Sequence, residues 1–298
     1  MKVAAIDCGT NTIKLLVGSV DGGALTVEVK EARMVRLGEG LDQSGVISEG
    51  ALKRAFTALD EYADLIRDHG AERIRFVATS ATRDAANADV FTAGVRERLG
   101  VEPEVVAGTE EAALAFDGAV RNLRAQPAQP VMIIDIGGGS TELIYGADDA
   151  FSMQIGSVRQ HERHLRSDPP TMEEIAACVA DIDDALDASP VSAAGAASVI
   201  GVAGTITTIA AGVLDLPAYD REAIDQAVLP VGEVHALVDR LVAMTVSERL
   251  TLPWMHPGRA DVIAAGGLIL SRMLRRAPVD ELLISEADIL DGIAWSLA

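Results

Sequence analysis

The chain has 298 residues, 49% of them hydrophobic and only 3% aromatic, and its formal net charge is −20. This length exceeds what a single hydrophobic core usually supports, so two domains are expected. The negative charge excludes a general nucleic-acid-binding surface and a surface that binds anionic membranes. A core made of Ala, Val, Ile and Leu is typical of α/β folds with parallel strands.

The chain begins with an apolar run, residues 3–6, that ends in Asp7 and leads into a Gly/Thr turn. A buried strand does not tolerate a carboxylate at its middle, so the strand is predicted to end near Asp7. Glycine lets a backbone approach an anion closely, and Thr and Asn side chains add donors. The predicted phosphate-binding loop consists of Gly9, Thr10, Asn11 and Thr12.

Strands and helices alternate along the rest of the first half. Apolar residues at helical spacing predict two helices, and Gly/Asp turns separate the strands. A third helix begins near Glu111, with Thr109 as its candidate N-cap. The predicted strands are 13–20, 24–30, 76–79 and 103–107, and the predicted helices are 50–69, 87–99 and 109–120.

The N-terminal pattern recurs at an offset of 128 residues. An apolar run ends in Asp135, a glycine-rich turn follows, and a hairpin is predicted around the turn 146–149. Residues 201–208 likewise repeat 76–83, at an offset of 125. The chain therefore contains two copies of one phosphate-binding unit. The candidate phosphate-binding residues of the second copy are Gly137, Gly138, Gly139, Ser140, Thr141, Gly204 and Thr205.

The repeat sets the expected domain limits. Prolines interrupt residues 126–130, so the N-terminal domain is expected to span 1–124 and the C-terminal domain 125–298. The helix at about 286–298 is able to pack back on the first domain. The other elements predicted in the second half are helices over 171–186 and 231–244 and a strand over 281–285.

Two cysteines, Cys8 and Cys178, provide no disulfide framework and no metal-site spacing, which favours the cytoplasm. No signal peptide is expected, because Asp7 interrupts the first apolar run. The uncharged stretch 191–214 is long enough to span a membrane. Its glycines and threonines instead favour a buried strand, turn and helix, so no membrane partner is expected.

Four acidic residues lie beside the predicted phosphate loops: Asp7, Glu111, Asp135 and Glu142. Two phosphate loops with carboxylates between them, in a cleft between the domains, predict phosphoryl transfer. Carboxylates and phosphate oxygens are hard ligands that suit Mg²⁺, with Mn²⁺ as the alternative. Among the arginines, Arg83 is the expected phosphate contact, because it follows a Thr-rich turn.

Six motifs, in the same order along the chain, resemble the exopolyphosphatase / guanosine pentaphosphate phosphohydrolase family. They begin at Asp7, Ala78, Gly108, Asp135, Gly156 and Gly204, and the segment 135–142, Asp-Ile-Gly-Gly-Gly-Ser-Thr-Glu, is the most specific. The resemblance implies two tandem actin-like (ribonuclease H-like) domains. It also implies that Glu111 is the catalytic base and that Arg83 grips phosphate. Asp7, Asp135 and Glu142 are the implied metal ligands, the last two with a catalytic role.

The resemblance implies an Mg²⁺-dependent exopolyphosphatase that releases terminal phosphate from inorganic polyphosphate. Alternatives are a guanosine pentaphosphate 5′-phosphohydrolase, a sugar kinase on the same fold, and a sensor that binds polyphosphate or nucleotide without turnover. The chain lacks the His-Asp motif of longer family members, and Leu290 stands where many relatives have arginine. These departures leave open the substrate preference, the chain-length preference and whether two subunits associate as a homodimer.

Overall fold

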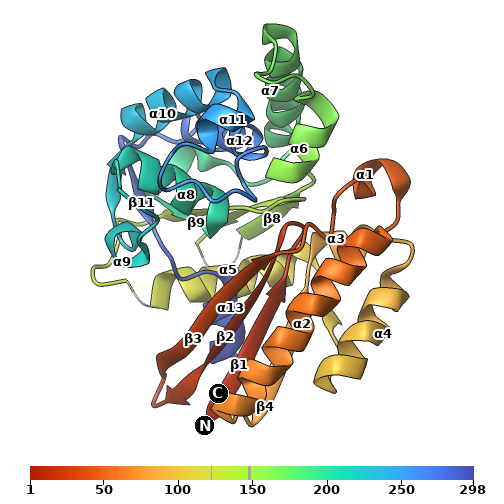
Figure 1. Ribbon diagram of the computed structural model, residues 1–298. Coiled ribbons are helices and arrows are strands. Elements are labelled where there is room, and N and C mark those ends of the chain that lie inside the picture. The colour runs from red at the N-terminus through yellow and green to blue at the C-terminus, as the bar shows by residue number, and fades with distance from the viewer. Residues whose placement is uncertain (122, 147–148) are drawn as a thin grey trace. The chain divides into compact units, whose positions relative to one another are not determined.

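A computed structural model describes residues 1–121, 123–146 and 149–298 and divides the chain into two compact units. The first comprises Met1–Gly118 together with Asp288–Ala298, and the second comprises Ala119–Ala287. Each unit contains one sheet and its covering helices (Figure 1). The expected α/β fold class is confirmed.

The first unit is built on a five-stranded sheet with the order β3-β2-β1-β4-β5. The first three strands form an antiparallel meander, whereas β1, β4 and β5 run parallel. The strands are β1 (Lys2–Cys8), β2 (Thr12–Asp21), β3 (Ala24–Met34), β4 (Arg73–Ala78) and β5 (Glu104–Val105), and the helices are α1 (Leu41–Ser44), α2 (Glu49–His69), α3 (Ser80–Asp84), α4 (Ala88–Leu99), α5 (Gly108–Arg121) and α13 (Ile289–Trp295).

The two faces of this sheet are covered by different helices. Ile6 and Leu15 point into the core that α2 covers, with Tyr62 of α2 donating to the Ile13 carbonyl at 3.0 Å. Successive strand residues alternate between faces, so Asp7 and Lys14 point to the opposite side. There α13 packs against β1 and β2, which assigns the end of the chain to the first unit.

The second unit is built on a six-stranded sheet with the order β10-β11-β9-β6-β7-β8. The series β8-β7-β6-β9-β11 repeats the order and strand directions of the first sheet, which confirms the internal repeat. The strands are β6 (Val131–Ile136), β7 (Thr141–Tyr145), β8 (Asp149–Met153), β9 (Ser198–Val202), β10 (Val228–Pro230) and β11 (Glu281–Ile284), and the helices are α6 (Ser157–His164), α7 (Met172–Asp187), η1 (Ala193–Gly195), α8 (Ala203–Val213), α9 (Arg221–Ile224), α10 (Val231–Ala243), α11 (Val246–Arg249) and α12 (Ile263–Leu274).

Most elements predicted from the sequence are present, within a few residues of their expected ends. The stretch 191–214 contains η1, β9 and α8, and among the described residues no helix is long and apolar enough to cross a membrane. Part of the predicted turn 146–149 lies outside the described residues. Thr109 as the N-cap of α5 was wrong. The Ala107 carbonyl accepts from the Glu110 and Glu111 backbone N–H groups, so the helix starts before Thr109.

Candidate functional site

The loop between β1 and β2 is held by hydrogen bonds of its backbone and of its side chains. The Gly9 N–H donates to the Thr12 carbonyl at 3.0 Å, which closes the turn. The Thr10 and Ser80 hydroxyls lie 2.8 Å apart and are both buried, so they connect this loop to α3. The Thr10 carbonyl accepts from the Gly38 N–H at 2.9 Å. These contacts tie the loop to α3 and to the segment that contains Gly38.

Asp7 lies at the end of β1, directly before this loop, and it is only 5% exposed. Lys14 is its register partner on β2, and the Lys14 ammonium lies 3.2 Å from the Asp7 carboxylate. Burial raises the pKa of Asp7 above its ordinary value, against the opposing attraction of Lys14. The first loop is thus flanked by a buried carboxylate and a cation that partly neutralises it.

In the second unit the loop between β6 and β7 packs on the start of α6. The Gly137 carbonyl accepts from the Ser157 N–H at 2.9 Å. The Gly138 carbonyl accepts from the Val158 and Arg159 N–H groups at 2.9 and 3.1 Å. The Gly139 carbonyl accepts from the Arg159 side chain at 2.8 Å. In a trans peptide the next N–H points opposite to the carbonyl. The N–H groups of residues 138–140 therefore point away from α6, so they are oriented toward a ligand on the opposite side of the loop.

Gly156, directly before α6, allows this contact. A Cβ atom on Gly156 would lie 2.4 Å from the Gly138 oxygen and 2.6 Å from the Gly139 carbonyl carbon. Both obstacles are backbone atoms, so no side-chain rotation would relieve the clash. Gly156 is therefore required for the loop to reach α6 in this conformation.

Asp135 and Glu142 form the acidic pair of the second unit. They are register partners on the antiparallel strands β6 and β7, so their side chains leave the same face of the sheet as neighbours. Asp135 is 7% exposed and Glu142 is 1% exposed. The Ser152 hydroxyl donates to the Glu142 carboxylate at 2.7 Å and helps to orient it. Two buried carboxylates side by side are suited to a hard divalent cation.

Glu111 lies in the first turn of α5 and its side chain is buried. Arg83 of α3 donates to the Val106 carbonyl at 2.6 Å and to the Glu111 carboxylate at 3.5 Å. Its neighbour Glu110 is half exposed and pairs with Arg75 at 2.9 Å. Of the two adjacent glutamates, Glu111 is thus the buried one, held next to the arginine that was expected to contact phosphate.

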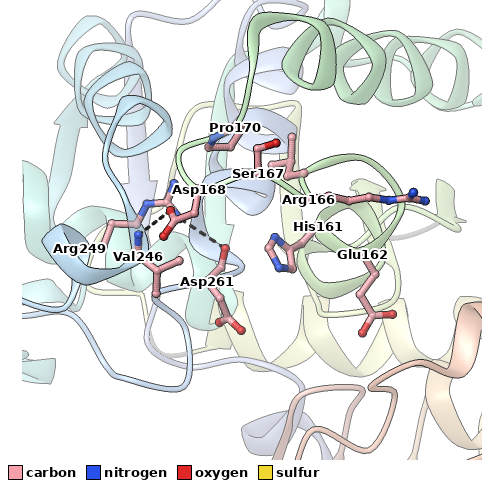
Figure 2. Close-up of a pocket in the computed structure, with 10 residues that line it drawn as sticks. His161, Glu162, Arg166, Ser167, Asp168, Pro170, Val246, Arg249 and Asp261 are labelled. Carbon is pink, nitrogen blue, oxygen red and sulfur yellow. Dashed lines mark hydrogen bonds between the residues drawn. The ribbon is translucent and has the colours of Figure 1, made fainter.

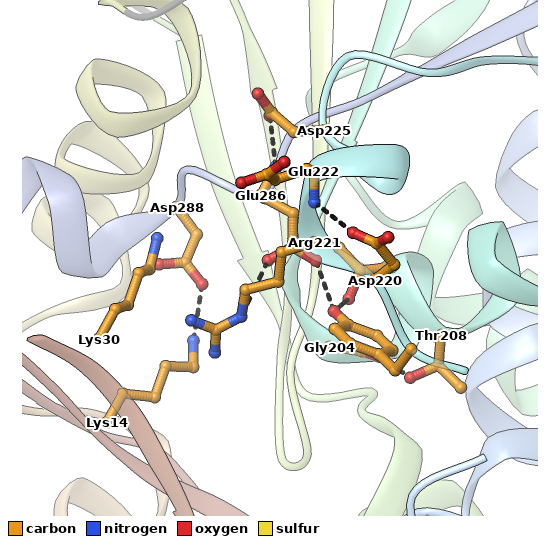
Figure 3. A network of polar contacts seen from close by, with 12 residues as sticks. Lys14, Lys30, Gly204, Thr208, Asp220, Arg221, Glu222, Asp225, Glu286 and Asp288 are labelled. Atoms are coloured by element: carbon orange, nitrogen blue, oxygen red, sulfur yellow. Dashed lines mark hydrogen bonds and ion pairs between the residues drawn. The ribbon is translucent and has the colours of Figure 1, made fainter. Parts of the chain in front are cut away.

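The region around Gly204 contains an arginine that sequence reasoning missed. The Arg259 guanidinium donates to the Gly204 carbonyl at 3.0 Å and to the Thr208 hydroxyl at 2.9 Å. A Cβ atom on Gly204 would lie 2.1 Å from the Arg259 guanidinium, so glycine is needed to admit the side chain. Burial lowers the pKa of Arg259, although Tyr219 and Glu286 oppose this effect. Figure 3 includes Gly204, Thr208 and the neighbouring Glu286.

The second unit also has a pocket of about 410 Å³ away from the predicted residues. Its lining includes His161 of α6, Arg249 of α11 and Asp261 (Figure 2). Residues between Leu165 and Pro170 complete one side. Arg249 is 2% exposed and donates to the Leu241 and Ala260 carbonyls, which explains its burial structurally. None of the candidate site residues lines this pocket.

Each unit brings together part of the predicted site. In the first unit Asp7 adjoins the loop 9–12, α3 joins that loop through Ser80, and Arg83 on α3 contacts Glu111. In the second unit Asp135, Glu142 and the loop 137–141 follow one another along β6 and β7. Within the described residues, no group of three or more His, Cys, Asp or Glu side chains is arranged to hold a metal ion.

Comparison with known proteins gives a consistent result. The model of the Ppx/GppA phosphatase family matches residues 16–298. Exopolyphosphatase 2 of Mycobacterium tuberculosis is 43% identical over 315 residues, covering 100% of this chain and 98% of the relative.

Solved structures agree with the sequence match. The crystal structure of an exopolyphosphatase-like protein is 40% identical and superposes with a TM-score of 0.97, covering 100% of this chain and 97% of that protein. The Ppx/GppA family member of Aquifex aeolicus is 29% identical with a TM-score of 0.82, at coverages of 100% and 97%. The expected actin-like two-domain fold is confirmed, and this chain belongs to the Ppx/GppA phosphatase family.

Proposed function

We propose that this phosphohydrolase is an exopolyphosphatase that releases terminal phosphate from inorganic polyphosphate in a reaction that needs Mg²⁺ or Mn²⁺. The observation that carries the proposal is the structure of the second loop. This loop connects Asp135 to Glu142 along the chain, and its N–H groups point away from α6. Backbone donors grip phosphate oxygens, while carboxylates would repel them without a cation. The full-length similarity to a protein named exopolyphosphatase 2 supports polyphosphate as the substrate.

The residues of the second unit fit a divalent cation. Mg²⁺ in phosphoryl-transfer sites is commonly held by one or two protein carboxylates, with water and substrate oxygens completing the shell. Asp135 and Glu142 supply these two carboxylates, and Asp7 is the proposed ligand of the first unit, sharing its charge with Lys14. A bound cation would neutralise charge on the phosphate oxygens. The loop residues Gly137–Thr141, Gly9–Thr12 and Gly204–Thr205 are the proposed phosphate contacts.

Glu111 is the proposed general base. It accepts a proton from water as the water oxygen attacks the terminal phosphorus atom, and the bridging P–O bond breaks as its electron pair leaves with the shortened chain. Arg83, held next to Glu111, is proposed to bind a phosphate oxygen. Its contact with Glu111 also helps to hold the carboxylate in place.

The test is phosphate release from short polyphosphate, long polyphosphate and guanosine pentaphosphate, measured side by side with Mg²⁺. We expect polyphosphate to be hydrolysed and Glu111→Gln to lower kcat by ~10²-fold or more, because it removes the base. Glu110→Gln is the matched control, since Glu110 is the adjacent exposed glutamate and should retain activity. Hydrolysis of guanosine pentaphosphate alone would favour the other activity, and binding without turnover would favour a sensor.

A further inference from the structure

Lys14 is shared between two carboxylates of the first unit. Its ammonium donates to the Asp288 carboxylate at 2.7 Å (Figure 3). The same ammonium lies 3.2 Å from the Asp7 carboxylate. Asp288 comes from the far end of the chain, yet it is only 7% exposed. Lys14 lies two residues after the first phosphate loop, Gly9–Thr12, and Asp7 lies two residues before it. The charges of Asp7, Lys14 and Asp288 therefore lie beside the loop.

Asp288 also stabilises the start of α13, so a test must remove its charge while it keeps this structural role. It is the N-cap of α13, where its carboxylate accepts from the Leu290 N–H at 3.0 Å. Its own N–H donates to Asp291, which completes a capping box. Asp291 in turn pairs with Lys30 at 2.9 Å. The same helix start thus carries two buried aspartates, each paired with a lysine from the sheet.

The two aspartates differ in their distance from the loop. Lys14 lies on β2, next to β1 and opposite Asp7, whereas Lys30 lies on β3, one strand further from β1. A charge removed at Asp288 is felt directly by the lysine that flanks the loop. A charge removed at Asp291 is felt first by a lysine on the outer strand.

We propose that Asp288 is a positioning residue for the first phosphate loop: it draws the Lys14 ammonium toward α13 and limits the positive charge presented beside Gly9–Thr12. The proposal rests on the proposed function, because it takes that loop to bind substrate phosphate. The Asp288 carboxylate offsets the positive charge of Lys14, whether or not a cation is bound at Asp7. This added negative charge weakens binding of a polyanion and favours release of phosphate products.

The experiment uses the full chain and Asp288→Asn, in which asparagine keeps the N-cap but loses the charge. We expect KM for short polyphosphate, and the calorimetric Kd for inorganic tripolyphosphate, to fall about threefold to tenfold. We expect kcat to change less than about twofold, because the base and the acidic pair are untouched. Asp291→Asn is the matched control and should lower both constants by less than half of that effect.

Three outcomes would overturn the proposal: an unchanged tripolyphosphate Kd in Asp288→Asn, an equal fall in both variants, or a change in thermal stability alone. If the asparagine variant does not fold, Asp288→Ser is used, because serine also caps helices. The calorimetric measurement needs no turnover. A wild-type protein that binds tripolyphosphate without hydrolysing polyphosphate would therefore refute the proposed function, while the Kd comparison would still test Asp288.

Discussion

Lys14 lies opposite Asp7 in the register of β1 and β2, with its ammonium 3.2 Å from the Asp7 carboxylate. At the corresponding register of the second unit, Glu142 lies opposite Asp135. One repeat therefore pairs its aspartate with a cation and the other pairs it with a second anion. Because Lys14 partly neutralises it, Asp7 is the weaker of the proposed metal ligands, whereas the two carboxylates of the second unit together suit a divalent metal. The two hairpins therefore differ in charge at these positions, although the residues pair in the same register.

This divergence predicts that the metal requirement depends on the second unit. Asp135→Asn and Glu142→Gln should each raise the Mg²⁺ concentration for half-maximal activity by about tenfold or more, because each removes one hard ligand. Ser152→Ala should raise it less, since Ser152 only orients Glu142. The measurement is the rate of phosphate release against free Mg²⁺. An unchanged metal requirement in both carboxylate variants would contradict the assignment, as would full activity in excess chelator.

The close approach of Gly156 to the second loop gives another prediction. Gly156→Ala should lower activity by about tenfold or more, because its methyl group would displace the loop peptides whose N–H groups are proposed to bind phosphate. The control is Gly232→Ala, since a Cβ at Gly232 in α10 meets no atom within 4 Å. That variant should keep its activity. Equal activities of the two variants would show that the loop tolerates the displacement.

The sequence predicted elements whose signal is local. The helix α2 is amphipathic, with Ser48 accepting from the Ala51 N–H at its start and Gly70 at its end, and it was placed within a residue. Several helices were missed, among them α12 and α6. Nearly every residue of α12 is buried, so no polar face marks its period. The short helix α6 has no side-chain N-cap, and its start is tied to carbonyls of the glycine loop instead.

The site residues likewise divide into those that a local sequence pattern marks and those that only the packing brings to their partners. Asp135 and Glu142 were predicted as site residues because each flanks a glycine-rich turn, and their pairing in register follows from a tight hairpin. Arg259 and Asp288 reach their partners across 55 and 274 residues of sequence, and neither stands in a local pattern. Contacts of this kind depend on which helices cover which sheet face. That information lies in the packing and not in the spacing of the residues.

Asp7→Asn should raise the free energy of unfolding while it lowers activity. Burial raises the pKa of Asp7, so its ionisation costs stability as the pH rises from the unfolded pKa through the folded pKa. At neutral pH this cost is present in the wild type and absent from the variant, because asparagine carries no charge. Lys14 would keep Asp288 as its partner. The measurement is urea unfolding at pH 7, and a clear loss of stability would show that Lys14 needs both carboxylates.

Asp183 on α7 forms ion pairs with Arg272 of α12 and with Arg276. These pairs should make the free energy of unfolding depend on pH in the acidic range. Arg272 donates to both of its carboxylate oxygens at 2.8 Å, and Arg276 donates to one of them at 2.8 Å. These arginines outweigh the opposing effect of burial and hold the pKa of Asp183 below its ordinary value of 3.8. A carboxyl with a lowered folded-state pKa stabilises the fold above its unfolded pKa, and this contribution is lost as the pH falls through the folded pKa.

Asp183→Asn should therefore lower the free energy of unfolding by about 1 kcal/mol at pH 7, the size expected for a partly exposed bidentate pair. The difference from wild type should begin to shrink below about pH 4, where the carboxyl of the unfolded chain is protonated, and should disappear as the pH falls through the lowered folded-state pKa. Asp184→Asn is the control, because Asp184 is the exposed neighbour on the same helix. Urea unfolding of the three proteins between pH 3 and pH 7 tests this. A difference that persists undiminished at pH 3 would mean that Asp183 acts through packing and not through its charge.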